Sequence, residues 1–208
     1  MTLILDLDHL LIRTESLKKR MFESVKALGI SKAVWNHTYA ATVKRARRRY
    51  SYNAGLHGEK IALVLRKPKL SARITSKLYA AVLETKDLVY KDAVKFLRRA
   101  RTAGAAIILL TRGEAAWQNK KIKAARIRKF FDRVIITPEA KSSILKTRFR
   151  LVPPTYLITD NAEEIQKLRS LGIEIIQLIR RDGRYQRRAR GVPVVYNLDQ
   201  TWKIIKKT

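Results

Sequence analysis

The sequence predicts an α/β fold, a doubly wound parallel sheet of Rossmann-like topology that carries an all-helical insertion. Three observations predict it. Short apolar runs alternate with longer amphipathic segments along the chain. Five of the six apolar runs are continuously apolar, as is typical of parallel strands covered by helices on both faces. One interval, residues 14–85, has helical periodicity and no convincing strand.

The six apolar runs give the expected strands. They lie at residues 3–7, 106–110, 134–136, 156–158, 173–178 and 192–196. The sixth run is less uniformly apolar than the others, so we expect it at an edge of the sheet.

Amphipathic segments give the expected helices. Between the strands they lie at residues 88–103, 114–130, 139–149 and 162–171. The last of these ends at Gly172, the residue type that favours a helix C-terminus. Inside the insertion we expect helices at residues 16–28, 32–50, 59–65 and 71–83, with turns near Gly29, residues 55–58 and Pro68. The predicted domains are therefore an α/β core of residues 1–13 and 86–208, and a helical cap of residues 14–85.

Composition narrows the class of protein. The 208 residues, 46% hydrophobic and 30% charged, suffice for a globular core with a modest insertion. Absence of cysteine excludes disulfides, thiolate zinc sites and cysteine nucleophiles, and is compatible with a reducing compartment. The first apolar run lacks a preceding basic region and contains two aspartates, and no run reaches the length of a membrane span. We therefore expect a cytoplasmic protein with no membrane partner.

The formal charge is +29, from 46 Lys and Arg against 17 Asp and Glu. Such a charge attracts polyanions. Two basic tracts stand out, residues 44–49, followed by Tyr50 and Tyr52, and residues 180–190 in a loop before the last strand. Cations mixed with aromatics suit a nucleic-acid backbone and its bases, while a solvated basic surface is the simpler interpretation.

Polar residues follow three of the predicted strands where each strand ends, the edge at which open α/β sheets bind ligands. These residues form three groups: Asp6, Leu7 and Asp8; Thr111, Arg112 and Gly113; Thr159, Asp160 and Asn161.

Two carboxylates at i and i+2 of an extended chain project to the same side and repel each other unless a cation or a proton intervenes. Mg²⁺ prefers a few carboxylate oxygens and retained waters, which Asp6, a main-chain carbonyl near Asp8, and Asp160 would supply. With the charge neutralised, one carboxylate is able to act as nucleophile and the other as general acid and base.

Here the sequence resembles the haloacid dehalogenase superfamily, in the segments LILDLDHLLI, IILLTRG, a downstream lysine and YLITDNAEEI, in that order along essentially the whole chain. The resemblance implies an aspartyl-phosphate intermediate on Asp6, with Asp8 protonating the leaving oxygen and then activating water. It implies that Thr111 bonds the transferring phosphoryl group and that Asp160 and Asn161 complete the Mg²⁺ shell. The helical insertion matches the position of the family's first cap, which covers the site and selects the substrate.

The lysine of the third segment has several candidates. We choose Lys141, which follows the third strand by only a few residues and is placed to reach Asp6 and the phosphate; Lys146 lies further along the helix, and Lys121 is a third choice. The predicted catalytic residues are Asp6, Asp8, Thr111 and Lys141. The predicted phosphate-binding residues are Thr111, Arg112, Gly113 and Lys141, and the predicted metal ligands are Asp6, Asp8, Asp160 and Asn161.

The chain departs from the family pattern after the second aspartate, where His9 and Leu10 replace the usual Gly-Thr. Leucine removes a hydroxyl that helps to orient the loop. In the fourth segment Asn161 stands at an acidic position, with Glu163 and Glu164 nearby.

Structural roles compete with these functional ones. Thr111 precedes Glu114 in a capping-box pattern, and Asp160 is also placed as a helix N-cap. His9, His37 and His57 are too scattered for a metal cluster, although His57 is a candidate for the substrate face of the cap. Trp35 and Tyr39 are expected in the cap core, and Trp117 and Trp202 are expected to pack.

The sequence thus predicts a Mg²⁺-dependent phosphomonoesterase acting on a small phosphate ester or nucleotide. The alternatives are a nucleic-acid-binding protein of the same fold with weak or absent catalysis, and a phosphatase that acts on nucleic-acid ends.

Overall fold

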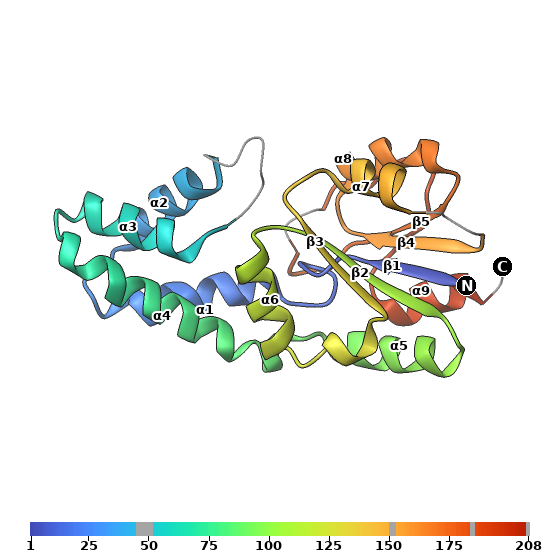
Figure 1. Cartoon of the computed structure of the whole chain (residues 1–208), viewed down its shortest axis with the longest axis horizontal. Coiled ribbons are helices and arrows are strands. Elements are labelled where there is room, and N and C mark those ends of the chain that lie inside the picture. The colour runs from blue at the N-terminus through green and yellow to red at the C-terminus, as the bar shows by residue number, and fades with distance from the viewer. Residues whose placement is uncertain (45–51, 150–152, 184–185, 207–208) are drawn as a thin grey trace.

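A six-stranded parallel sheet forms the centre of the protein (Figure 1), as the sequence predicts. The computed structural model describes residues 1–44, 52–149, 153–183 and 186–206. The strand order is β3-β2-β1-β4-β5-β6, so the sixth strand lies at an edge as expected. The strands are β1 (Thr2–Leu5), β2 (Ala106–Arg112), β3 (Arg133–Thr137), β4 (Thr155–Thr159), β5 (Glu174–Leu178) and β6 (Val194–Val195).

Helices cover both faces of the sheet (Figure 1). One face packs against α5 (Lys91–Thr102) and α9 (Leu198–Ile205), the other against α7 (Lys141–Arg148) and α8 (Ala162–Leu168). Successive residues of β1 point to opposite faces, so Leu3 and Leu5 belong to one apolar core and Ile4 to the other. This arrangement explains why the strands read as unbroken apolar runs.

Four helices make up the described part of the insertion: α1 (Thr14–Lys26), α2 (Lys32–Lys44), α3 (Ala54–Val64) and α4 (Ser71–Leu83). They lie together beside the sheet, on the side of α6 (Ala115–Ala124) (Figure 1). The described residues between 14 and 83 contain no strand. Two 3₁₀ turns, η1 (Pro68–Leu70) and η2 (Thr85–Leu88), precede and follow α4. The domain boundary at residue 85 stays a prediction.

Helix α3 differs from its prediction, because the expected turn at residues 55–58 is helical. The Asn53 side chain accepts a hydrogen bond from the Leu56 N–H at 2.9 Å and starts the helix five residues early. Gly58 is required there by packing, since an added Cβ would lie 2.3 Å from the Thr75 hydroxyl of α4. The glycine marks close contact between two helices rather than a turn.

Two other helices are shorter than predicted. The segment expected as one helix over residues 114–130 is α6 followed by η3 (Arg128–Phe130), because Arg126 adopts a left-handed backbone conformation with φ of 56°. The helix expected from residue 88 begins at Lys91, after η2. Gly172 closes α8 and the short η4 (Arg169–Leu171) with φ of 63°, as predicted.

The first basic tract, residues 44–49 with Tyr50, lies outside the described residues apart from the backbone of Lys44, which ends α2. The second tract forms a loop between β5 and β6, with residues 184 and 185 outside the described part. Its first member is not solvated: Arg180 is 6% exposed and forms an ion pair with Asp92 at 2.7 Å. Among the helices described, none has the length and apolarity to cross a bilayer.

Candidate active site

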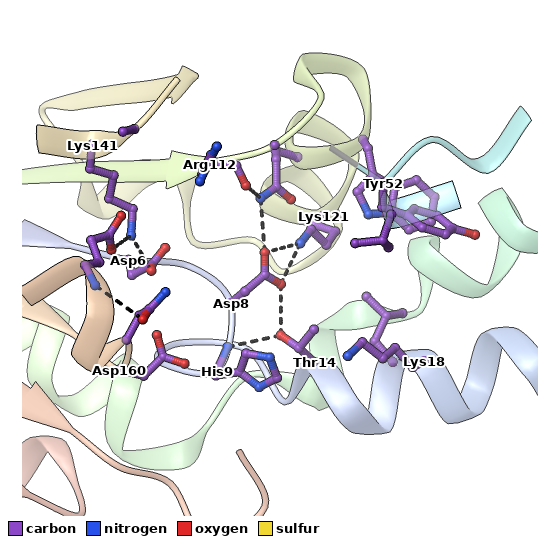
Figure 2. Close-up of a pocket in the computed structure, with 18 of the residues that line it drawn as sticks. Asp6, Asp8, His9, Thr14, Lys18, Tyr52, Arg112, Lys121, Lys141 and Asp160 are labelled. Atoms are coloured by element: carbon purple, nitrogen blue, oxygen red, sulfur yellow. Dashed lines mark hydrogen bonds and ion pairs between the residues drawn. The ribbon is translucent and has the colours of Figure 1, made fainter. Parts of the chain in front are cut away.

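The carboxyl ends of β1, β2 and β4 meet at one edge of the sheet, because β1 pairs with both neighbours in parallel register. Asp6 follows β1 directly and Asp160 follows β4, whereas Thr111 and Arg112 are the last residues of β2 rather than the residues after it. A cavity of about 480 Å³ opens over this edge and is lined by Asp6, Asp8 and Asp160 (Figure 2). The structure therefore brings the three predicted segments together.

Asp6 is buried at the floor of the cavity. One carboxylate oxygen accepts the Leu7 N–H at 2.8 Å, and the other accepts a hydrogen bond from the Lys141 ammonium (Figure 2). Burial raises the pKa of Asp6, Lys141 lowers it, and the nearby charge of Glu164 raises it again, with a net upward direction. The choice of Lys141 over Lys146 as the partner of Asp6 agrees with this contact, since Lys146 is exposed.

Lys141 is shared by two acids, because its ammonium also lies 2.9 Å from Glu164. Burial lowers the pKa of Lys141, but the charges of Asp6 and Glu164 outweigh it, so the net direction is upward. Glu164 also accepts a hydrogen bond from the Thr159 hydroxyl at 3.2 Å. Lys141 is therefore held charged and fixed in place beside Asp6.

Asp160 is 4% exposed, and no residue in the described part of the chain donates a hydrogen bond to its buried Oδ2 atom. Burial raises its pKa well above the ordinary value, and the charge of Asp6 raises it further. A buried carboxylate oxygen without a donor is unfavourable unless a proton or a cation meets it. Asp6 and Asp160 together have the donor chemistry for a hard divalent cation.

Within the described residues, no group of three or more His, Cys, Asp or Glu side chains is placed to hold a metal ion. Mg²⁺ does not need such a group, since it commonly binds one or two carboxylates and keeps several waters. Two buried carboxylates, Asp6 and Asp160, are donors that fit Mg²⁺ with waters completing its shell.

Asn161 also lines the cavity, and its side chain caps the N-terminus of α8. Its oxygen accepts the Glu163 N–H at 3.0 Å and the Glu164 N–H at 3.4 Å. The role of Asn161 as a metal ligand stays a prediction, and its oxygen also serves as the helix cap. The competing expectation that Asp160 caps this helix is wrong, since Asn161 does so.

Asp8 has surroundings unlike those of Asp6 (Figure 2). Both of its carboxylate oxygens lie 2.6 Å from the Lys121 ammonium. Gln118 donates to it at 3.0 Å and the Thr14 hydroxyl at 2.8 Å. Burial raises the pKa of Asp8, but Lys121 and these hydrogen bonds outweigh it, and the pKa lies well below the ordinary value. Its side-chain oxygens are all engaged, so only a main-chain carbonyl here would serve a metal.

The loop after Asp8 replaces the missing threonine hydroxyl in another way. His9 has a left-handed φ of 58°, which suits the glycine usual at this position in the family. Its N–H donates to the Ile12 carbonyl and to the Thr14 hydroxyl, each at 3.1 Å. Leu10 is fully buried. Thr14 thus orients the loop and contacts Asp8.

The predicted phosphate-binding residues at the end of β2 form hydrogen bonds within the fold. Thr111 is 1% exposed, and its hydroxyl accepts a hydrogen bond from Gln118 at 2.8 Å. The sequence predicts that Gly113 binds the phosphate. In the structure the N–H of Gly113 donates instead to the Thr137 carbonyl at 2.9 Å. Arg112 lines the cavity and donates to the Pro138 carbonyl at 3.2 Å. The capping interpretation of Thr111 is wrong, because Glu114 caps α6.

The insertion supplies the opposite wall of the cavity, including Lys18, Tyr39 and Tyr52. Tyr39 also stacks on the buried Trp35, as the cap-core prediction requires, with ring centroids 5.9 Å apart. His57 does not line the cavity: it is fully buried, with hydrogen bonds of 3.1 Å to the Thr38 hydroxyl and 2.8 Å to the Tyr52 hydroxyl. Burial lowers the pKa of His57 to about 4.

Sequence reasoning missed Gln118, named Glu164 without giving it a role, and ranked Lys121 third for a different role. Gln118 and Lys121 are spaced i, i+3 on α6, on the buried face that also carries Trp117 and Ile122. Polar residues at apolar positions of a helix were the available signal. Glu164 gave a weaker one, since it also fits an ordinary first-turn acid.

Comparison with known proteins agrees with the geometry. The profile of the haloacid dehalogenase-like hydrolases matches residues 1–147. The chain belongs to this family. No curated protein sequence matches it significantly.

Solved structures of haloacid dehalogenase-type proteins share the fold. The putative hydrolase YfnB from Bacillus subtilis, bound to magnesium, has a TM-score of 0.69 at 12% identity over 98% of this chain and 97% of its own. A putative beta-phosphoglucomutase from Thermotoga maritima has a TM-score of 0.69 at 13% identity over 100% of both chains. L-2-haloacid dehalogenase from Xanthobacter autotrophicus has a TM-score of 0.67 at 14% identity, over 99% of this chain and 98% of its own. At these identities the likeness establishes the fold of this haloacid dehalogenase-like hydrolase.

Proposed function

We propose that this hydrolase is a Mg²⁺-dependent phosphomonoesterase that works through an aspartyl-phosphate on Asp6. The observation that carries the proposal is the second carboxylate, Asp8, which lines the same cavity two residues from the buried Asp6. Both the nucleophile and a proton-transfer group are then available on one loop.

Leaving-group chemistry favours a phosphate ester over a haloacid. A halide departs as a stable anion and needs no proton, whereas the alkoxide of a phosphate ester leaves readily only when it is protonated. A carboxyl group at position 8 has a task in the first reaction and none in the second. The orphaned oxygen of Asp160 supports a bound cation in addition.

In the first step an Asp6 oxygen attacks phosphorus and the bond from phosphorus to the ester oxygen breaks. Asp8, ionised in the free protein, takes up a proton from solvent as the negatively charged ester enters the cavity, and gives that proton to the ester oxygen. Lys141, which contacts Asp6, neutralises charge on the nucleophile and on the phosphoryl oxygens. The Thr111 hydroxyl, at the end of the neighbouring strand, would bond the phosphoryl group.

In the second step the ionised Asp8 takes a proton from water, the water oxygen attacks phosphorus, and the bond to Asp6 breaks. Inorganic phosphate and the free carboxylate of Asp6 result. The ionised Asp8 of the structure, held by Lys121, is the form that this step requires.

Asp6, Asp160 and a main-chain carbonyl near Asp8 would hold Mg²⁺, which supplies positive charge that lets a phosphate dianion approach a carboxylate. The two buried carboxylates support this cation-binding proposal, and a metal contact from Asn161 stays a prediction.

The test is a paired assay with Mg²⁺, using 4-nitrophenyl phosphate as one substrate and 2-chloropropionate as the other. We expect phosphate release and no chloride release, with phosphate release lost in Asp6→Asn. Chloride release without phosphate release would replace the proposal by dehalogenation. Asp6→Asn with the full rate would remove the mechanism altogether.

The formal charge of +29 favours a second candidate, an oligonucleotide phosphate as substrate or a nucleic acid as a bound partner. Retention on heparin and its salt dependence test this candidate. A surface that contacts several phosphates releases steeply as salt rises, and Asp6→Asn should then keep binding while losing turnover. A shallow salt dependence would leave the small phosphate ester as the substrate.

A further inference from the structure

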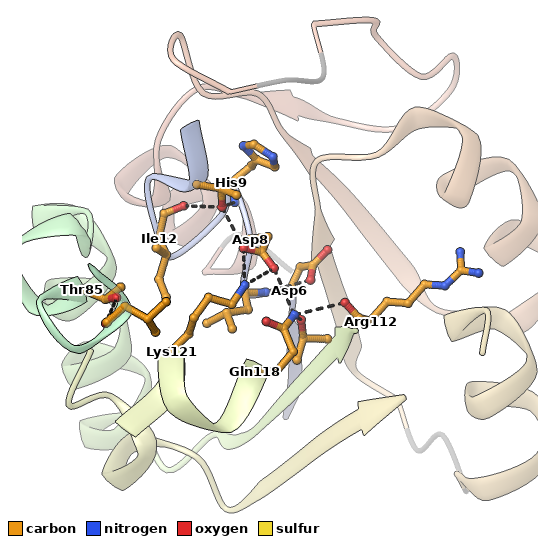
Figure 3. Close-up of polar contacts among 12 residues, drawn as sticks. Asp6, Asp8, His9, Ile12, Thr85, Arg112, Gln118 and Lys121 are labelled. Carbon is orange, nitrogen blue, oxygen red and sulfur yellow. Dashed lines mark hydrogen bonds and ion pairs between the residues drawn. The ribbon is translucent and has the colours of Figure 1, made fainter. Parts of the chain in front are cut away.

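Two side chains of α6 converge on Asp8 from inside the protein (Figure 3). Lys121 is 3% exposed and Gln118 is 1% exposed, although both are polar. The ammonium of Lys121 contacts both oxygens of Asp8 at 2.6 Å, and the amide of Gln118 contacts one of them at 3.0 Å. A buried lysine is unfavourable unless an acid pairs with it, so this placement requires Asp8.

The contacts determine one orientation of Asp8. A carboxylate has about four acceptor positions, and four donor contacts meet it here: two from Lys121, one from Gln118 and one from Thr14. With these positions filled, the side chain has no equivalent rotamer available. The carboxylate is therefore fixed relative to Asp6, which the same loop carries.

Gln118 links this arrangement to the phosphate end of the site. Besides Asp8, its amide donates to the Thr111 hydroxyl at 2.8 Å and to the Arg112 carbonyl at 3.1 Å. Gly113 leaves room for it, since an added Cβ would lie 2.8 Å from Gln118 Cγ. One buried side chain thus holds the first and second segments in register.

The donors differ in how easily a reactant replaces them. Lys121 and Gln118 are buried, whereas the Thr14 hydroxyl stands at the first turn of α1 and is partly exposed. An ester oxygen or a water that reaches Asp8 from the cavity would take the place of the Thr14 contact. Lys121 and Gln118 would remain as the fixed support.

We propose that Lys121, assisted by Gln118, is a positioning residue that orients Asp8 for proton transfer to the leaving group. The inference rests on the proposed phosphatase function. It makes Lys121 distinct from Lys141, which touches the nucleophile, and assigns a separate lysine to each of the two aspartates.

The test compares two substrates in Lys121→Met. 4-Nitrophenyl phosphate releases a stable phenolate that needs little proton assistance, whereas an alkyl phosphate such as phenethyl phosphate needs a well-placed acid. We expect kcat/KM, which reports the steps up to loss of the leaving group and not the later hydrolysis common to both esters, to fall about tenfold or more for the alkyl ester and clearly less for the aryl ester. Lys121→Arg, which restores the positive charge, should recover part of the alkyl-ester rate.

The matched control is Lys123→Met, an exposed lysine on the same helix, which should leave the ratio of the two rates unchanged. If Lys121→Met does not fold, Lys121→Gln tests the same ratio, because its amide keeps a donor for Asp8.

An equal loss for both esters, or no loss for either, would overturn the positioning role while the proposed function stands. Absence of phosphatase activity in the wild-type protein with either ester would instead remove the proposed function.

Discussion

Two buried polar clusters of this protein differ in how completely their atoms are bonded. In the insertion, both ring nitrogens of His57 have partners, and the cluster is neutral. At the sheet edge, Asp6 and Asp160 lie together as buried acids, and Asp160 Oδ2 has no hydrogen-bond partner among the residues that the structure describes. A completely bonded cluster stabilises the fold, whereas an incompletely bonded one indicates a place for a ligand.

The largest expected effect separates activity from stability at the sheet edge. Asp6→Asn should lower kcat about 10³-fold or more, because the amide is a poor nucleophile. Thermal unfolding should change little, since Lys141 keeps its contact with Glu164. A large loss of stability together with activity would place Asp6 among the structural residues and weaken the comparison.

The insertion should show the opposite behaviour. The pKa of His57 in the folded protein is about 4 against 6.5 for the free side chain, so only the unfolded chain gains its proton as pH falls through this window. The stability that neutral His57 contributes is present above about pH 6.5 and is lost progressively down to about pH 4, by about 3 kcal/mol.

Chemical unfolding at several pH values checks this expectation. The difference in unfolding free energy between the wild type and His57→Leu should shrink as pH falls, while the exposed His37→Leu should show no such trend. A constant difference across the window would mean that His57 is not held neutral.

Replacing the unpartnered acid should reverse the usual direction of a mutation. Asp160→Asn removes a buried charge, so the metal-free protein should become more stable by about 1–2 kcal/mol. Mg²⁺ should stabilise the wild type and not the variant, because a ligand stabilises only the state that binds it. Thermal unfolding of the wild type and of Asp160→Asn, with and without Mg²⁺, tests this expectation. Equal stabilisation of both proteins would mean that the cation binds away from Asp160.

Two glycines provide the smallest expected effects. Gly58→Ala introduces a methyl group against Thr75 and should destabilise the protein by about 1 kcal/mol with little effect on kcat. Gly113→Ala displaces Gln118 and should lower kcat with little loss of stability. Melting temperature and kcat measured for both variants check this expectation. If Gly58→Ala and Gly113→Ala changed stability and kcat alike, the insertion and the sheet edge would not differ as described.

The fold could be predicted because parallel strands covered on both faces must be apolar throughout, which the runs containing Leu3, Leu109 and Leu157 display. The meeting of Asp6, Thr111 and Asp160 followed from the same topology, since parallel strands end at one edge. The contact of Lys141 could be predicted because this residue follows β3 by only a few positions in the sequence.

What could not be predicted depends on contacts between distant segments. Lys121 is one of 46 basic residues, and its position on the apolar face of α6 is only a weak signal until that helix is packed against the Asp8 loop. Gly58 is a residue type typical of turns. Its position inside a helix is explained only by the close approach of α4. Asn161 was assigned to the metal by position, but its local backbone favours a cap.

The central claim is that Asp6 carries the phosphoryl group, and a rapid acid quench followed by peptide mass spectrometry tests it directly. Protein mixed with Mg²⁺ and excess phosphate ester, and quenched within one turnover, should yield the peptide containing Asp6 with the added mass of one phosphoryl group. Asp6→Asn should yield none. A wild-type protein that hydrolyses the ester while the added mass appears on another residue would contradict the account.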